Sequence, residues 1–209
     1  MHLDLEAIYS YHCDLHFAGK KLPTGGRIID PGDNSTIVNP PHSQPWAVLV
    51  GCCCSGTLIS KRHVITSAHC TRVDYVVVGE HNRNKNDGEE KIKVINRIPY
   101  PGYRPGYDTG ADLMILVLEK EVKNKFAKPA LLPKENERFD EYIVSGFGLT
   151  AVGVYSDFLR TVKLSDYGTH ESCYKLGSTF FEPDKHICGE NLNDIFLGPC
   201  DGDSGGMSL

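Results

Sequence analysis

Short apolar runs separated by turn-forming residues make up most of the chain from Trp46 onward. The runs have the length of β-strands, and no segment between them carries the apolar spacing of an amphipathic helix over a helical length. Runs at this spacing are typical of a β-barrel or β-sandwich, so the pattern predicts an all-β fold. The predicted strands are residues 46–50, 63–67, 75–78, 92–98, 113–118, 142–146 and 159–164.

Residues 1–27 do not share this pattern, and we interpret them as a pro-segment or linker. They end in Pro23-Thr24-Gly25-Gly26-Arg27, a composition that favours an exposed turn. The segment lacks the basic start and apolar centre of a secretory signal. We expect that such a signal has been removed from this chain or that the sequence is incomplete at this end.

Composition argues against two classes of partner. The 209 residues carry 22 Lys and Arg against 27 Asp and Glu, a formal net charge of −5. This balance provides no basic surface for nucleic acid and no polybasic patch for a membrane. No apolar run reaches the roughly 20 residues of a membrane-spanning helix. We expect no nucleic-acid and no membrane partner, and the length suits one large all-β domain or two small ones.

A serine flanked by glycines provides the candidate chemistry. Ser204 lies in the segment 202–206, where backbone N–H groups can turn toward a substrate carbonyl. A serine hydroxyl is a weak nucleophile at neutral pH and needs a base, which in turn needs an orienting group. His69 follows one apolar run and is the candidate base, and Asp112 opens another and is the candidate carboxylate. Asp108 is a rival carboxylate, but its neighbours are turn formers typical of a solvated loop.

Six motifs lie along the chain in the order Pro41-His42-Ser43-Gln44-Pro45-Trp46, Cys54-Ser55-Gly56-Thr57-Leu58-Ile59, Thr66-Ser67-Ala68-His69-Cys70, Asp112-Leu113-Met114-Ile115-Leu116, Ser145-Gly146-Phe147-Gly148 and Gly202-Asp203-Ser204-Gly205-Gly206. Chymotrypsin/trypsin-family serine proteases have these motifs in the same order, and the chain resembles that family from about residue 28 to its last residue. The resemblance implies two six-stranded antiparallel Greek-key barrels, with the site in the cleft between them. It implies a protease domain at residues 28–209, with a first barrel at about 28–130 and a second at about 139–209. We expect the second barrel to be incomplete, because the C-terminal strands and helix that follow the serine in relatives are missing from this chain.

The resemblance implies a role for each residue of the site. Ser204 is the nucleophile, His69 the general base and then acid, and Asp112 the orienting carboxylate. The backbone N–H groups of Gly202 and Ser204 form the oxyanion hole. Losing one comparable donor costs roughly 10²–10³ in turnover, so this geometry matters as much as the three side chains.

A zymogen-type activation site is implied before the protease domain. Cleavage after Arg27 frees the amine of Ile28, which then inserts beside Asp203 and orders the oxyanion loop. The sequence departs from the family in that Asp30-Pro31 stands where glycine is usual. The segment 37–39 is a second, poorer candidate for the new amino terminus, because no basic residue precedes it.

Two further sites follow from the resemblance. Gly198, six residues before the nucleophile, lies at the base of the specificity pocket, and the absence of an acidic residue there suggests a preference for uncharged side chains, as in elastase or chymase. The acidic loop 79–90 resembles the calcium loop of trypsin-like relatives, and oxygen-rich ligation suits Ca²⁺. The alternative is a hydrated acidic hairpin tip. The calcium ligands implied are Glu80, Asn82, Lys85, Asp87 and Glu90.

Eight cysteines indicate an oxidising compartment if they pair. The resemblance implies the disulfides Cys54–Cys70 and Cys173–Cys188, and it gives Cys200 a partner downstream of the serine. The run 52–54 is unusual, and we expect its additional cysteines to be small core residues or to form an intermolecular bridge. Zinc is a poorer interpretation, because only His69 and Cys70 follow at a usable spacing. The pairing of Cys13 and of residues 52 and 53 stays open.

The function expected is that of a secreted, extracellular serine endopeptidase that hydrolyses peptide bonds through an acyl-enzyme. It requires no cofactor, and the acidic loop is a candidate site for a structural Ca²⁺. It acts on protein or peptide substrates, is open to protein inhibitors, and is a monomer. The alternative is a non-catalytic, truncated homologue that acts as a binding module. An unrelated β-rich binding domain with chance motifs is a third interpretation, which the ordered motifs argue against.

Overall fold

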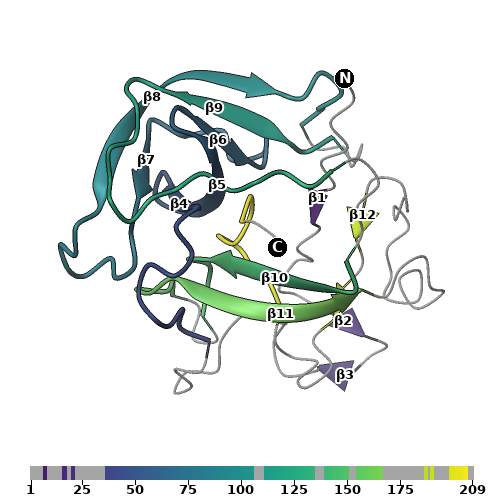
Figure 1. Cartoon of the computed structure of the whole chain (residues 1–209). Helices are drawn as coiled ribbons and strands as arrows, with labels where there is room; N and C mark the ends of the chain where they lie inside the picture. The colour runs from purple at the N-terminus through teal and green to yellow at the C-terminus, as the bar shows by residue number, and fades with distance from the viewer. Residues whose placement is uncertain are drawn as a thin grey trace.

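The computed structural model describes residues 7–8, 16–17, 20–21, 36–105, 111–134, 139–150, 154–166, 186–187, 189–190 and 198–206. Within these ranges the regular structure consists of β-strands, and the fold is all-β as predicted (Figure 1). In the same ranges there is no helix that is both long and apolar enough to span a membrane.

Six antiparallel strands form a closed barrel in the first half of the chain (Figure 1). Their order around the barrel is β4-β5-β6-β9-β8-β7, so that the last strand pairs again with the first. Closure leaves no exposed strand edge, which in an open sheet attracts other chains. The strands are β4 (Ala47–Val50), β5 (Cys54–Ser60), β6 (His63–Thr66), β7 (Tyr75–Val78), β8 (Glu90–Pro99) and β9 (Met114–Leu118).

The barrel is filled by apolar side chains that alternate along its strands. On β9 the residues at positions 114, 116 and 118 are buried and those between them are half-buried, because successive side chains point to opposite faces. Burying each large apolar side chain contributes roughly 1.5–3 kcal/mol, so this interior stabilises the frame that carries the site. The fully buried members are Val48, Val50, Leu58, Val64, Val76, Val78, Ile92, Leu116 and Leu118.

A second, partial sheet lies beside the barrel and contains β10 (Glu141–Gly146), β11 (Arg160–Asp166) and β13 (Gly189–Glu190), all antiparallel. Phe147 and Leu159 extend from this sheet into a cluster with Leu49 and Val77 of the barrel. That cluster joins the two units. Two short ladders complete the description: β1 (Ala7–Ile8) with β12 (His186–Ile187), and β2 (His16–Phe17) with β3 (Lys20–Lys21).

Each of the seven predicted strands is confirmed, and no end is displaced by more than two residues. The expected fold class is confirmed as a trypsin-like one: a closed six-stranded barrel and a second, partial sheet. The strand β5 was not among the predicted strands. It carries Ser55, Gly56 and Thr57 at buried positions, so it lacks the apolar run that marked the others.

The segment 198–206, drawn in yellow in Figure 1, runs between the barrel and the β10–β11 sheet. It is attached to both units by backbone hydrogen bonds. The N–H of Ser55 on β5 donates to the carbonyl of Ser204 at 2.9 Å, and the N–H of Leu149, just after β10, donates to that of Asp201 at 2.7 Å. This attachment brings the serine of the motif to the boundary between the two units.

Candidate active site

His69 and Asp112 are brought together by the pairing of two neighbouring barrel strands. Thr66, the last residue of β6, pairs with Met114, the first residue of β9. His69 lies three residues after the end of β6, and Asp112 lies two residues before the start of β9, so both extend from the same end of the barrel. The register of one strand pair therefore sets the distance between the base and the carboxylate.

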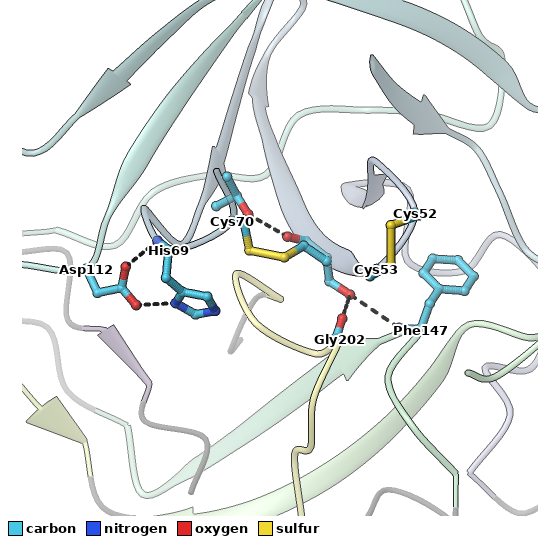
Figure 2. The surroundings of a disulfide bond; sticks show 10 residues. Cys52, Cys53, His69, Cys70, Asp112, Phe147 and Gly202 are labelled. Carbon is cyan, nitrogen blue, oxygen red and sulfur yellow. Dashed lines mark hydrogen bonds and ion pairs between the residues drawn. A yellow bond between two sulfur atoms is a disulfide. The ribbon is translucent and has the colours of Figure 1, made fainter. Parts of the chain in front are cut away.

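Asp112 holds His69 with both of its carboxylate oxygens (Figure 2). One oxygen, Oδ2, lies 2.5 Å from Nδ1 of the imidazole, and the other, Oδ1, accepts the backbone N–H of His69 at 2.8 Å. A carboxylate accepts a hydrogen bond from Nδ1–H, which keeps the proton on Nδ1 and leaves Nε2 as the unprotonated nitrogen. The imidazole is thus oriented, and fixed in the tautomer that a general base requires.

The two side chains shift one another's pKa in opposite directions. The hydrogen bond from Asp112 raises the pKa of His69, and the carboxylate charge adds to that effect against the opposing influence of burial. Burial favours a higher pKa for Asp112, but the hydrogen bond and charge of His69 outweigh it and hold the pKa below its usual value. Asp112 therefore stays ionised while His69 takes up and releases a proton.

In the loop that carries Ser204, four consecutive carbonyl groups are held by hydrogen bonds. The carbonyl of Asp201 accepts from Leu149 N–H at 2.7 Å, and that of Asp203 accepts from Gly206 N–H at 2.8 Å. The carbonyl of Gly202 accepts from the Ser55 hydroxyl at 2.9 Å, and that of Ser204 accepts from the Ser55 N–H at 2.9 Å. Four successive peptide groups are thus held in fixed orientations.

The N–H groups of Gly202 and Ser204 differ from the carbonyl groups of the same loop. Neither donates to an acceptor within the described part of the chain, whereas the carbonyls of the peptide groups to which they belong are both bonded. Gly202 and Gly205 adopt φ values of +93° and +78°, a region that residues with a side chain rarely enter. Among the described residues, these two N–H groups are therefore unbonded donors of the kind that an oxyanion hole requires.

Ser204 is half-buried, and its hydroxyl makes no hydrogen bond with His69 within the described residues. A short covalent path nevertheless joins their surroundings. Cys70, next to His69, forms a disulfide with Cys54, which is followed directly by the Ser55 that binds Ser204. Catalytic hydrogen bonds are often long or poorly aligned before substrate binds, so the missing bond does not argue against Ser204 as a nucleophile that His69 activates.

Asp203 lies fully enclosed behind the serine, at 4% exposure. Its carboxylate accepts the N–H groups of Gly148 at 2.9 Å and Cys200 at 3.0 Å. Burial raises the pKa of Asp203 to about 7 in spite of these two donors. Asp203 has no ion-pair partner among the described residues, so an ammonium group brought to it would be strongly bound.

The cysteines correct part of the sequence interpretation. Cys54 and Cys70 form the implied disulfide, with an S–S distance of 2.03 Å. Cys52 and Cys53 form a disulfide with each other, and Cys52 is exposed in a turn before β5 (Figure 2). The expectation of extra core residues or an intermolecular bridge is therefore wrong, because adjacent sulfurs have paired outside the strand.

Oxidation of these four sulfurs also removes the zinc interpretation. Cys54, His69 and Cys70 lie within 4.8 Å of one another, but both of their sulfurs are in the disulfide and are not thiolate ligands. Cys200 is disulfide-bonded, although its partner was expected downstream of the serine. Cys13, Cys173 and Cys188 lie outside the described residues, so the second implied disulfide stays a prediction.

The acidic loop has two carboxylate oxygens without a partner. Oε1 of Glu80 and Oδ1 of Asp87 are buried and form no hydrogen bond among the described residues. Burial raises the pKa of Glu80 to about 7, and the nearby charges of Asp87 and Glu89 add to the shift. Glu90 differs, since it forms an ion pair with Lys120 at 2.8 Å.

Some of the remaining predicted residues lie within the described part of the chain and others lie outside it. Gly198 faces open space, because a Cβ atom built on it meets no heavy atom within 4 Å among the described residues other than its chain neighbours. Arg27, Ile28 and the rival carboxylate Asp108 lie outside the described residues. Ile37 of the second activation candidate pairs with Arg160 in the structure.

Sequence reasoning missed one residue of the site, Ser55. Ser55 lies in the motif Cys54-Ser55-Gly56-Thr57-Leu58-Ile59 but was given no role there, whereas its hydroxyl donates to the carbonyl of Gly202 in the loop. The available signal was a hydroxyl side chain at the centre of a segment that reads as a barrel strand, because a buried polar group requires a partner.

Comparison with known proteins identifies the family. Residues 34–207 match the trypsin family. The chain is similar to human kallikrein-15, at 38% identity over 53% of this chain and 46% of that protein, so it spans about half the length of that relative. It is similar to rat granzyme B, at 31% identity over 79% of this chain and 72% of that protein.

The fold has a matching solved structure. Neuropsin, a serine protease expressed in the limbic system of mouse brain, superposes with a TM-score of 0.74 at 25% identity, covering 83% of this chain and 81% of its own. The anchored loop, the paired His69 and Asp112, and these matches lead to one conclusion: the chain belongs to the trypsin family of serine proteases.

Proposed function

We propose that the protein is a serine-type endopeptidase that hydrolyses peptide bonds through an acyl-enzyme formed on Ser204, with His69 and Asp112 as its partners. The observation that carries this proposal is the two-oxygen hold of Asp112 on His69, at 2.5 Å from the ring and 2.8 Å from the backbone N–H. The bond to Nδ1 sets the orientation and tautomer of the ring, as a general base requires, and the bond to the backbone N–H holds the carboxylate in place beside it.

The reaction proceeds in two stages. Nε2 of His69 takes the proton of the Ser204 hydroxyl while the oxygen attacks the substrate carbonyl carbon. The carbonyl oxygen becomes negative and accepts the N–H groups of Gly202 and Ser204. His69 then gives its proton to the leaving amine, the C–N bond breaks, and an ester to Ser204 remains. Water repeats the sequence on that ester and releases the acid.

Hydrolysis of a mixed peptide library, followed by mass spectrometry of the fragments, tests this function. We expect defined new amino and carboxyl ends with the wild-type protein and none with Ser204→Ala. Equal fragment patterns from both proteins would indicate a contaminating protease and would remove the proposal.

Activation by cleavage after Arg27 is part of the proposal. It is supported by the buried Asp203 carboxylate, which lacks a cationic partner among the described residues. The freed amine of Ile28 supplies that partner and stabilises the ionised form of Asp203. The oxyanion loop, of which Asp203 is a member, is then held from behind.

For substrate choice, we propose an uncharged residue before the cut bond. The support is Gly198, whose position opens into free space and offers no acidic group to a Lys or Arg side chain. The expected substrates are proteins or peptides. Protein inhibitors that resemble such a substrate are expected to bind at the same site.

We propose that Ca²⁺ binds the acidic loop through side-chain oxygens of Glu80, Asp87 and Glu90 and carbonyl oxygens at Asn82 and Lys85. The unpartnered buried oxygens of Glu80 and Asp87 fit a hard cation that prefers oxygen ligands. Glu90 has to release Lys120 to join them. The ion is structural and takes no part in the reaction.

The protein is proposed to work outside the cell as a monomer. The support for the location is the pair of disulfides among the described residues, which persist in an oxidising compartment.

A further inference from the structure

The hydroxyl of Ser55 stands between the two units of the fold. Ser55 lies on β5 of the barrel and is only 2% exposed. Its Oγ donates to the carbonyl of Gly202 at 2.9 Å and accepts the backbone N–H of Phe147 at 3.2 Å. One side-chain atom therefore joins the barrel, the oxyanion loop and the end of β10, and the mechanism above does not use it (Figure 2).

We propose that Ser55 is a positioning residue for the oxyanion hole, acting through the peptide group between Gly202 and Asp203. This inference rests on the proposed function. The carbonyl of that peptide is held by the Ser55 hydroxyl, and its N–H donates to the carbonyl of Cys200 at 3.0 Å. The peptide separates the two oxyanion donors, so its orientation sets the direction of both.

Gly202 needs an external anchor because it has none of its own. With φ at +93° and no side chain, it can rotate its flanking peptides more freely than any other residue. Among the described residues, the hydroxyl of Ser55 donates the hydrogen bond that the Gly202 carbonyl accepts. Removing the Ser55 hydroxyl leaves two buried groups without a partner, the carbonyl of Gly202 and the N–H of Phe147. Rotation of the Gly202 peptide then lets its carbonyl find another donor.

Ser55 is itself held firmly enough to serve as an anchor. Its carbonyl accepts the hydroxyl of Thr66 at 2.7 Å, and its N–H donates to the carbonyl of Ser204 at 2.9 Å. The residue before it, Cys54, is joined by a disulfide to Cys70 beside the base. Ser55 thus fixes the donors in the same frame as the imidazole that must act together with them.

Ser55→Ala tests the proposal, with Ser60→Ala as the matched control. Both serines lie on β5, and both hydroxyls are hydrogen-bonded, but Ser60 bonds to His63 away from the loop. The probe is an alkyl fluorophosphonate, and the measurement is the second-order rate of Ser204 labelling in cleaved, active protein between pH 5 and 9. Ser55→Thr, which keeps a hydroxyl, serves as the rescue variant.

We expect Ser55→Ala to lower the plateau rate about 10-fold to 100-fold, less than the loss from a removed oxyanion donor. The pH midpoint should stay unchanged, because His69 and Asp112 are untouched. Ser60→Ala should match wild type, and Ser55→Thr should recover part of the rate. A plateau within threefold of wild type, or a fall accompanied by a displaced midpoint, would overturn the proposal.

Amide hydrogen exchange tests the positioning role of Ser55 without requiring that the protein be an active protease. In Ser55→Ala, the N–H groups of Phe147 and Asp203 should exchange about tenfold faster or more, while those of β6 and β9 stay as in wild type. If wild type is not labelled at all, the proposed function fails and exchange alone decides on Ser55. Unchanged exchange at both residues would refute the positioning role.

Discussion

Replacing Asp112 with Asn should leave the His69 side chain in place while changing which of its ring nitrogens carries the proton. The carboxylate accepts two N–H donors at once, the backbone N–H of His69 and its Nδ1 proton. An amide has only one acceptor oxygen, so Asn can satisfy one donor and must present its NH₂ group to the other. If the oxygen keeps the backbone N–H, the NH₂ group faces Nδ1. The imidazole then carries its proton on Nε2 and cannot accept the serine proton.

The magnitude follows from that tautomer. A histidine in the wrong tautomer lowers the rate by about 10⁴-fold, which corresponds to about 5 kcal/mol in activation free energy. The pH dependence changes as well. Asp112 raises the pKa of His69, and labelling requires the uncharged imidazole, so the wild-type rate is lost as pH falls through that raised pKa. The substitution removes the support for the charged form and moves the midpoint to lower pH.

Fluorophosphonate labelling of Ser204 across pH measures both quantities. Asp74→Asn is the matched control, since Asp74 is a surface carboxylate, 92% exposed and paired with Arg97 at 3.0 Å. We expect wild-type behaviour from that control and a loss of about 10⁴-fold from Asp112→Asn. A folded Asp112→Asn protein that labels within tenfold of wild type would show that the carboxylate does not set the tautomer.

Three further predictions concern stability. Cys54→Ala with Cys70→Ala opens a loop of sequence separation 16 and should lower the unfolding free energy by about 3 kcal/mol in urea titrations, and an unchanged midpoint would contradict this. Added Ca²⁺ should raise the thermal midpoint of wild type but not of Glu80→Gln, and the calcium proposal falls if chelator and Ca²⁺ give the same curve. Because burial raises the pKa of Asp203 to about 7, the uncleaved chain should lose up to about 4 kcal/mol between pH 4 and 8 as that carboxyl ionises. Asp203→Asn should lack this contribution, and an equal pH dependence in both proteins would refute it.

Local patterns were sufficient to predict most of the barrel. Strands with apolar runs, such as β7 and β9, were found because their interior side chains are Val, Leu, Ile and Met. The strand β5 was missed because its buried positions include Ser55, Gly56 and Thr57. Two of them are small for a reason outside their own segment: a side chain on Gly56 would meet Val50 and Val64 inside the barrel, and the Ser55 hydroxyl bonds to Gly202, 147 positions later in the chain.

The candidate site shows the same division. Motifs identified His69, Asp112 and the serine loop, because each carries recognisable chemistry in its own segment. No pattern in the sequence could give the two-oxygen contact of Asp112 or the anchoring role of Ser55, since both depend on strand register and on distant backbone groups. The pairing of Cys52 with Cys53 was likewise beyond a strand-based interpretation, because the two residues lie in a turn.

The central claim is that His69, Asp112 and Ser204 act as one catalytic unit, and intact-mass spectrometry after fluorophosphonate treatment tests it most directly. In protein cleaved after Arg27, we predict one adduct per chain, located on Ser204 and absent from both Ser204→Ala and His69→Ala. Folded, cleaved protein that acquires no adduct on Ser204 would contradict the claim and favour a non-catalytic homologue that serves as a binding module.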